Sequence, residues 1–425
     1  MLSAIAAIFV IAYAAIALEH PLRVNKSATA LIGAGLLWAI YAATIGDHAL
    51  VTRQLDESVA ATAQIVFFLI GAMTIVEVID AHDGFEVITS RIRTTSQVTL
   101  LWLVGFVTFF LSAILDNLTT TIVMISLVQR LIGKRDDRLL FASLIVIAAN
   151  AGGAWTVIGD VTTTMLWIGG RISPLNIMGA VFAASLVNLL VPLAVIGYSL
   201  KGKVIALPSE EDRLQGFGLF ERNLMFALGL GVLIAVPAFK ATTHLPPFMG
   251  VLLGLGLVWL AGEIVHRDKD EHVRRPLTLA HALIRIDMSS IVFFVGILLA
   301  VACLEHAGLL TMLARWLETT FGRQEIIVVL LGLLSAIIDN VPLVAATMGL
   351  YDIAHYPPDS FIWEFIAYCA GTGGSILIIG SAAGVAAMAL EKIEFFWYAR
   401  RIAGPALAGY LAGAVVYIAQ HAAMH

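Results

Sequence analysis

Apolar segments long enough to cross a lipid bilayer recur along the whole chain of 425 residues. A membrane-spanning helix needs about 20 consecutive, mainly apolar residues. Hydrophobic residues make up 60% of this chain and charged residues 13%, whereas soluble proteins carry about 25% charged residues. The pattern predicts an all-α polytopic membrane protein. It excludes a soluble enzyme, a disordered protein and a nucleic-acid-binding protein, because the net charge of −5 leaves no basic surface for phosphates.

The loops between the apolar segments are short, so we expect one membrane domain without a separate soluble part. The first segment has no basic stretch before it, and we therefore expect no cleaved signal peptide. The predicted segments are 2–18, 27–46, 60–80, 98–131, 139–169, 177–200, 221–240, 246–265, 286–304, 325–351, 361–390 and 402–420.

Two of these segments, 98–131 and 325–351, are too long for a single crossing, and each carries an Asp-Asn pair near its middle. A straight helix over 98–131 would be about 51 Å long, against a hydrocarbon core of about 30 Å. Division at Asp116-Asn117 gives two arms that are slightly short of a full crossing. The lengths therefore predict two re-entrant hairpins, each with a polar tip inside the membrane.

The distribution of basic residues supports these hairpins, because cytoplasmic loops collect Lys and Arg. If both hairpins return to the side they leave and the N-terminus is periplasmic, the inside loops hold 20 of the 25 Lys and Arg residues and the outside loops hold 5. The inside loops are then 19–26, 81–97, 130–138, 201–222, 266–285 and 391–401, and the outside loops are 47–58, 170–176, 240–247, 305–324 and 351–360.

The sequence also contains an internal repeat. SAILDNLTTT at 112–121 returns as SAIIDNVPLV at 335–344, IVFF at 65–68 returns at 291–294, and GGAWTVIGDVTT at 152–163 matches GGSILIIGSAAG at 373–384. The predicted topology gives the two repeats inverted orientations, which together with interrupted helices is typical of secondary transporters. The predicted organisation is an N-terminal span at 1–26, a first repeat at 27–200 with hairpin 98–131 and broken helix 139–169, a connecting span at 201–245, and a second repeat at 246–425 with hairpin 325–351 and broken helix 361–390.

Three carboxylates, Asp116, Asp160 and Asp339, lie in the interruptions. A charged side chain at this depth is costly and marks an ion path or a bound ion, and oxygen ligands suit an alkali cation. Competition between Na⁺ and H⁺ for one carboxylate is sufficient for exchange. The alternative is that each Asp-Asn pair only caps the following helix. The predicted Na⁺ and H⁺ ligands are Asp116, Asn117, Asp160, Asp339 and Asn340, with Thr119, Thr120, Thr156, Thr162, Thr163, Ser375 and Ser381.

Glycines around the two broken helices are predicted to act as hinges that expose backbone carbonyls, although tight helix packing is an alternative role. They are Gly152, Gly153, Gly159, Gly373, Gly374 and Gly380. Glu77, Asp80 and Glu305 form a candidate proton path, with an interfacial position as the alternative. We expect no cofactor besides the transported Na⁺ or Li⁺ and H⁺.

The motifs SAILDNLTTT, GGAWTVIGD, SAIIDNVPL and the final GGS-x4-G run resemble those of the NhaD-type Na⁺/H⁺ antiporters of the ion transporter (IT) superfamily. In symporter relatives, Ser-Asn-Thr motifs stand at the hairpin tips, where this chain has Asp116-Asn117 and Asp339-Asn340. Negative charge at the tips disfavours an anionic substrate. The resemblance implies a homodimer in the bacterial inner membrane, with a scaffold domain and a transport domain that moves like an elevator.

The function predicted from these features is exchange of Na⁺ or Li⁺ for H⁺ by alternating access. The alternatives are an oxyanion or arsenite permease, or a Na⁺-coupled anion symporter, on the same fold. A cation channel does not need inverted hairpins with closed tips. An enzyme is disfavoured because the chain has no His-Glu-x-x-His motif and no paired nucleophile and base inside the predicted spans.

Overall fold

The computed structural model describes residues 2–17, 24–89, 94, 96–202, 219–337 and 339–424. In these ranges the regular secondary structure is helical and contains no strand. Seven helices of the described part are long and apolar enough to cross a membrane, in agreement with a polytopic membrane protein. They are α3 (Lys26–Ile45), α4 (His48–Ala81), α10 (Pro174–Ser199), α11 (Leu219–Thr243), α12 (Pro247–His266), α15 (Met288–His306) and α22 (Ala403–Met424).

Both overlong apolar segments are divided at their Asp-Asn pairs. Helix α6 (Gln97–Ser112) and helix α7 (Asn117–Leu131) flank the first pair, and α17 (Gln324–Leu334) and α18 (Asn340–Leu350) flank the second. Each aspartate is the N-cap of the second helix, because Asp116 accepts a hydrogen bond from the backbone N–H of Thr119 and Asp339 accepts one from that of Val341. Capping is therefore one role of both pairs.

Two further helices are interrupted at the glycine motifs. Helix α8 (Arg135–Gly153) is followed by a short irregular segment and then by α9 (Val161–Ile168). Helix α19 (Phe361–Gly373) is followed in the same way by α20 (Ala382–Glu391). Helices α8 and α19 are buried on nearly all faces beyond their first turns, so both belong to the interior of the protein.

Shorter helices complete the described chain. They are α1 (Leu2–Ala17), α5 (Glu86–Thr89), α13 (Glu271–Arg274), the 3₁₀ helix η2 (Arg275–Leu277), α14 (Leu279–Arg285), α16 (Leu309–Phe321) and α21 (Phe395–Arg401).

Several predicted loops contain helix, among them 47–58, 266–285, 305–324 and 391–401. Residues 47–58 begin the 34-residue helix α4, whose first turn is capped by the Asp47 side chain. The charged Arg53 and Glu57, which indicated a loop, lie one helical turn apart and form an exposed ion pair at 3.8 Å. Residues 305–324 contain α16, a strongly amphipathic helix whose apolar residues are interrupted too often to be recognised as a span. Much of the predicted inside loops 19–26, 81–97 and 201–222 lies outside the described residues.

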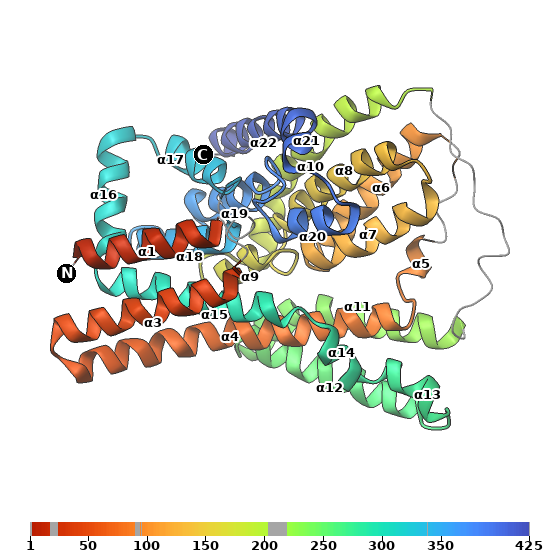
Figure 1. Cartoon of the computed structure of the whole chain (residues 1–425), viewed down its shortest axis with the longest axis horizontal. Coiled ribbons are helices and arrows are strands. Elements are labelled where there is room, and N and C mark those ends of the chain that lie inside the picture. Colours follow the sequence, from red (N-terminus) through yellow and green to blue (C-terminus); the bar gives the residue numbers. More distant parts are fainter. Residues whose placement is uncertain are drawn as a thin grey trace.

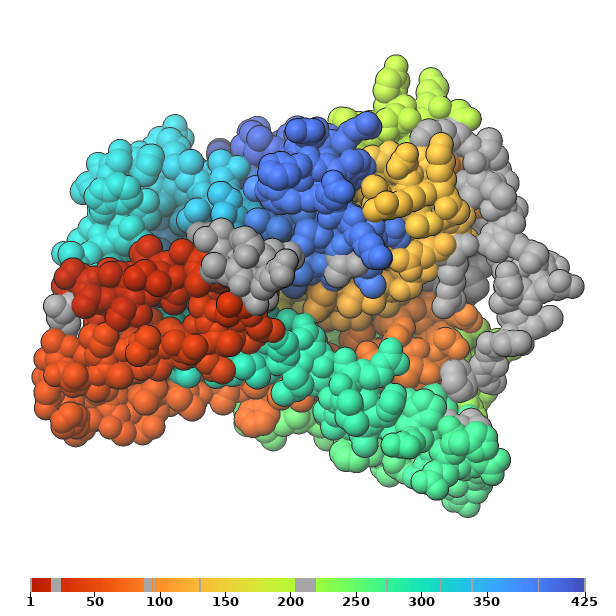
Figure 2. All heavy atoms as spheres, viewed as in Figure 1, coloured from red at the N-terminus to blue at the C-terminus, as the bar shows by residue number. Residues whose placement is uncertain are grey.

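The helices form two neighbouring groups. In Figure 1 one group lies below the other, and both extend along the horizontal long axis of the molecule. In one group, α3 packs against α1 and α15, and α4 packs against α12 and α15. In the other, α6, α7 and α20 pack around α8, and α10 packs along α22. The space-filling view shows the first group as a continuous band from red through orange to green along one edge of the molecule (Figure 2).

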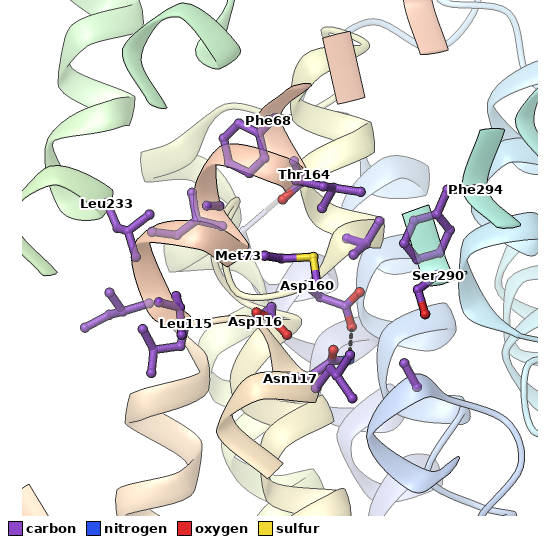
Figure 3. A pocket seen from close by; sticks show the side chains of 18 residues that line it. Phe68, Met73, Leu115, Asp116, Asn117, Asp160, Thr164, Leu233, Ser290 and Phe294 are labelled. Carbon is purple, nitrogen blue, oxygen red and sulfur yellow. Dashed lines mark hydrogen bonds between the residues drawn. The ribbon is translucent and has the colours of Figure 1, made fainter. Parts of the chain in front are cut away.

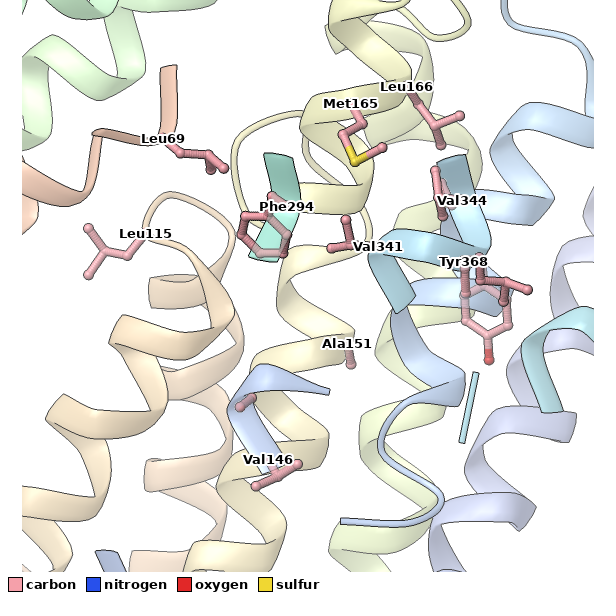
Figure 4. Packing of buried hydrophobic residues seen from close by; sticks show 14 of the residues in the cluster. Leu69, Leu115, Val146, Ala151, Met165, Leu166, Phe294, Val341, Val344 and Tyr368 are labelled. Carbon is pink, nitrogen blue, oxygen red and sulfur yellow. The ribbon is translucent and has the colours of Figure 1, made fainter. Parts of the chain in front are cut away.

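Buried apolar side chains connect the two groups. Leu69 of α4 and Phe294 of α15 belong to the same hydrophobic cluster as Leu115 beside the first Asp-Asn pair and Val341 beside the second. Figure 4 shows these side chains around the interrupted segments, with Tyr368 of α19 on the far side. The polar residues of the interruptions are therefore enclosed in an apolar surrounding, which strengthens their electrostatic interactions.

Candidate cation site

The four interruptions meet around the side chain of Asp160, which is 2% exposed. Its Oδ2 atom accepts a hydrogen bond from Asn117 Nδ2 at 2.8 Å and one from Asn340 Nδ2 at 3.3 Å. Asn117 follows the first helix break and Asn340 follows the third, so one carboxylate oxygen joins both Asp-Asn motifs. Residues that are separated by more than 200 positions in the sequence thus form one site, as the sequence predicts for Asp160, Asn117 and Asn340.

The second oxygen of Asp160 is used by its own helix. Oδ1 accepts from the backbone N–H of Thr162 at 2.9 Å and from the Thr162 hydroxyl at 3.0 Å, which makes Asp160 the N-cap of α9. Every partner of this carboxylate in the described ranges is a neutral donor. These hydrogen bonds compensate the buried negative charge, as a bound cation would.

Asn150 of α8 connects this site to the fourth interruption and was missed in the sequence. Its Oδ1 accepts from Asn117 Nδ2 at 2.9 Å, and its Nδ2 donates to Ser375 Oγ at 2.8 Å and to Ser381 Oγ at 2.9 Å. It is fully buried. Its position in an apolar stretch, two residues before Gly152-Gly153, is the sequence signal that could have identified it as a site residue. Through Asn150, the predicted ligands Ser375 and Ser381 belong to the same network as Asp160.

Asp116 lies beside Asp160 at a small, partly open cavity of about 50 Å³, which is large enough for a few water molecules. Figure 3 shows the side chains of Asp116, Asn117 and Asp160 at this cavity, opposite Met73 and Phe294. Asp116 accepts from the backbone N–H of Thr119 at 2.8 Å and from its hydroxyl at 2.7 Å. The residues that line the cavity include two carboxylates and no Lys, Arg or His.

Asp339 has a different partner. Its Oδ2 atom lies 3.2 Å from the Nζ atom of Lys26, the first residue of α3. The sequence interpretation assigned Lys26 to an inside loop, where it counted only as a marker of topology, and no sequence signal links it to Asp339. Among the three deep aspartates, Asp339 is the one with an ion pair within the described residues. Asn340, the next residue, reaches Asp160 instead.

The predicted threonine ligands divide into several roles. Thr119 and Thr162 donate to the carboxylates that cap their helices. Thr163 donates to the backbone carbonyl of Asp160 at 2.9 Å, and Thr156 donates to the carbonyl of Ala113 at 2.5 Å, so both hold the backbone of the breaks in place. The Thr120 hydroxyl is buried and finds no hydrogen-bond partner among the described residues.

The predicted hinge glycines sit where backbone packs on backbone. A Cβ atom on Gly152 would collide with the carbonyl oxygen of Phe109, and one on Gly380 would lie 2.5 Å from the carbonyl oxygen of Ser335. Close approaches of the same kind occur at Gly153, Gly159, Gly373 and Gly374. None of the six has positive φ. The structure therefore gives these glycines a packing role, and hinge movement stays a prediction.

The candidate proton-path residues lie outside the cavity of Asp116 and Asp160. Glu77 forms an ion pair with Arg285 at 2.8 Å. Asp80 is exposed and, with Asp83, Glu86 and Ser126, lines a second cavity of about 110 Å³ between α4 and α7. Glu305 is exposed near the end of α15.

Comparisons with known proteins agree on a membrane transporter. The model of a family described as citrate transporter matches residues 13–363. The chain is 51% identical to "Sodium/proton antiporter 1" of Arabidopsis thaliana over 98% of this chain and 72% of that protein. It is 47% identical to "Sodium/proton antiporter 2" of the same plant, over 98% of this chain and 99% of that protein. It is also 29% identical to the Na⁺/H⁺ antiporter NhaD of Vibrio cholerae, over 97% of this chain and 90% of that protein.

Proposed function

The chain belongs to the citrate transporter family and is related to the NhaD-type antiporters, and from this premise we propose that it exchanges Na⁺ for H⁺ across a membrane. It is a transporter, not an enzyme. Asp160 and Asp116 are the proposed sites at which the two ions compete. Asn117, Asn340 and Asn150 orient Asp160, and the Thr and Ser side chains of the four breaks complete the site.

One observation carries this proposal: the buried carboxylate of Asp160 and the half-buried carboxylate of Asp116 line a single small cavity whose described lining has no basic side chain. Such a cavity repels an anion and attracts a cation. Its volume of about 50 Å³ is enough for a monovalent ion with a few waters. The descriptions of the antiporter relatives agree with this charge preference.

The hydrogen bonds of Asp160 suggest how the two ions alternate. Asn117 and Asn340 now point their amide nitrogens at the carboxylate. An amide that turns by half a rotation presents an oxygen instead, and two such oxygens with Asp160 would form a hard ligand set for Na⁺. A proton on Asp160 compensates the same charge without this change. Na⁺ and H⁺ therefore exclude each other at one carboxylate, as exchange requires.

Alternating access is proposed to rest on two inverted repeats, 27–200 and 246–425, each with a hairpin and a broken helix. The matching order of α6–α9 and α17–α20 supports this arrangement. We further propose an elevator movement in which the group around α8 moves against the group around α3 and α4, and a homodimer held by the latter. Transport of Li⁺ belongs to the same proposal.

A second candidate is a Na⁺-coupled anion symporter or an oxyanion permease. The family description as citrate transporter favours it. In the described chain, however, the basic side chain nearest to these motifs, Lys26, is already paired with Asp339. An anion site would need this pair to open. Sodium/proton exchange is therefore the function that the geometry supports better.

The test is proton movement in everted membrane vesicles on addition of NaCl, LiCl, KCl or sodium citrate, at neutral and alkaline pH. We expect a response to Na⁺, and to Li⁺, that does not depend on the anion and is lost in D160N and in D116N. D268N is the matched control, because the exposed Asp268 pairs only with its neighbour Arg267. A proton response that requires citrate would favour the symporter, and silence with all salts would exclude the exchange.

The membrane in which the protein resides is proposed from mixed relatives. Two relatives are from a plant and others are bacterial. A bacterial inner membrane is our proposal for this chain, in line with the bacterial relatives, and the distribution of Lys and Arg supports a periplasmic N-terminus. Labelling of single cysteines introduced near Arg135 and near Asp352, on predicted opposite sides, tests the topology.

A further inference from the structure

The ion pair between Lys26 and Asp339 joins α3 to the start of α18, which packs on α9 and α19 as well as on α15. Lys26 begins α3, and Asp339 lies 313 residues later, directly before α18. The lysine Nζ atom lies 3.2 Å from Asp339 Oδ2 and 4.5 Å from the ring centroid of Phe293, which is fully buried on α15. The side chains of Lys26 and Asp339 are only 21% and 13% exposed. The ammonium is thus held by a carboxylate and an aromatic face at once.

The equivalent aspartate of the first half has no such partner. Within the described part of the chain, Asp116 accepts side-chain and backbone hydrogen bonds from Thr119, and Asp160 accepts from Thr162, Asn117 and Asn340. The ion pairs formed by the described residues include neither of these two carboxylates. Of three aspartates at equivalent or adjacent breaks, one is therefore neutralised by the protein itself and two are left for ions.

An ammonium group and Na⁺ carry the same charge and attract the same carboxylate oxygens. Helix α18 packs on α9 and α19, and α19 packs on α8, so a movement of these helices against α3 would open the pair. The carboxylate would then be buried without a partner, which is strongly unfavourable. Another cation must therefore take the place of the ammonium when the pair opens.

Resting on the proposed Na⁺/H⁺ exchange, we propose that Lys26 is a tethered cation that occupies Asp339 when no transported ion is bound there, and that Na⁺ displaces it during exchange. Lys26 is then a residue that sets the apparent affinity for Na⁺ and limits movement of the empty site. It acts through Asp339 and does not itself bind the transported ion. The pair keeps the transporter from crossing with a bare charge, which is a requirement of coupled exchange.

Transport by K26Q distinguishes this role from a merely structural one. At alkaline pH, where protons are scarce, loss of the competing ammonium should lower the apparent KM for Na⁺ by roughly threefold, a size typical of partly exposed ion pairs. K26R should restore the wild-type KM. In a D339N background, K26Q should have no further effect.

Lys240 provides a matched control. Its Nζ atom lies 4.7 Å from the ring centroid of Trp167 and donates to the Trp167 carbonyl at 3.0 Å, so it resembles Lys26 but has no carboxylate partner among the described residues. K240Q should keep the wild-type KM. A K26Q protein with an unchanged KM, or with a change that K240Q shares, would overturn the proposal.

A second measurement does not depend on transport. A water-soluble carbodiimide joins a lysine amine to an adjacent carboxylate, and mass spectrometry of the purified full-length protein detects the Lys26–Asp339 amide. We expect its yield to fall in NaCl relative to choline chloride of equal concentration. A constant yield would show that Na⁺ does not displace Lys26, whatever the vesicles show. If the wild type shows no Na⁺-dependent proton movement but the cross-link yield still falls in NaCl, the proposed Na⁺/H⁺ exchange is rejected while displacement of Lys26 by Na⁺ is supported.

Discussion

At the scale of single residues, the three deep aspartates differ through their partners. Asp160 is surrounded by neutral donors, Asp116 by Thr119, and Asp339 by the ammonium of Lys26. A carboxylate with neutral donors accepts a cation without first losing one, whereas a paired carboxylate must release its partner. The two Asp-Asn motifs are nearly identical in sequence, but this difference in partners gives the aspartates of the two halves different roles in ion binding.

A histidine pair outside the site predicts how the stability of the protein changes at acidic pH. His82 follows α4, and its ring stacks on that of His266 at the end of α12, with ring centroids 4.9 Å apart. The Nδ1 atom of His82 lies 2.6 Å from the Val78 carbonyl, so it carries the hydrogen, and Nε2 is left to accept from His266 Nε2 at 3.2 Å. Burial lowers the pKa of His82 below its ordinary value.

Protonation of His82 would place two N–H groups against each other. Because its folded pKa lies below the unfolded value of about 6.5, this pair stabilises the fold above that pH and the contribution is lost as the pH falls. We expect the thermal midpoint of the detergent-purified protein to fall more on acidification than that of H82Q. H272Q, which changes an exposed histidine, should behave as the wild type. Parallel curves for wild type and H82Q would contradict this interpretation.

Several site residues could be predicted from the sequence because charged or polar side chains are unusual inside apolar segments. A carboxylate such as Asp160 inside an apolar segment demands an explanation wherever it occurs. Lys26 and Asn150 could not be predicted as site residues, for different reasons. Lys26 lies at the end of a span, where lysine is common, and its partner is 313 residues away. Asn150 has no counterpart in the second half, so the internal repeat gave it no emphasis.

At the scale of helices, the interrupted elements depend on backbone contacts that only glycine permits. The Cα atom of Gly152 faces the Phe109 carbonyl, which brings α8 against α6. This contact places the first hairpin beside the break that carries Asp160. The breaks were predictable because Gly and Asp-Asn interrupt apolar segments, whereas the extent of α4 was not, because its first turns carry charges that are typical of loops.

Gly152→Ala tests that contact. The added methyl group would collide with a backbone oxygen that cannot move without shifting α6, so we expect a loss of roughly 3 kcal/mol in stability, at the upper end for overpacking. Gly35→Ala is the control, because nothing lies within 4 Å of its Cβ position on α3. That change should be neutral or should stabilise by up to about 1 kcal/mol through helix propensity. Thermal unfolding in detergent measures both, and equal midpoints would refute the packing role.

At the scale of the whole molecule, the cavity of Asp116 and Asp160 lies between the two helix groups. Val76 lines it from α4, and Leu118 lines it from α7. Leu115 and Ile158 line the same cavity, but both stand beside breaks of the group around α8. If exchange requires the groups to move against each other, a bridge between them should stop transport, and a bridge within one group should not.

The test compares two double-cysteine variants, V76C/L118C between the groups and L115C/I158C within one group. Both are made in a background without the native Cys303 and Cys369. A short, reducible bifunctional thiol reagent should abolish Na⁺-dependent proton movement in V76C/L118C, and reduction should restore it. The same reagent should leave most of the activity of L115C/I158C, which controls for filling of the cavity. Undiminished exchange by fully bridged V76C/L118C would mean that the two groups do not move apart. The ion would then have to reach Asp160 by local rearrangement of the breaks, with Lys26 released by side-chain motion alone.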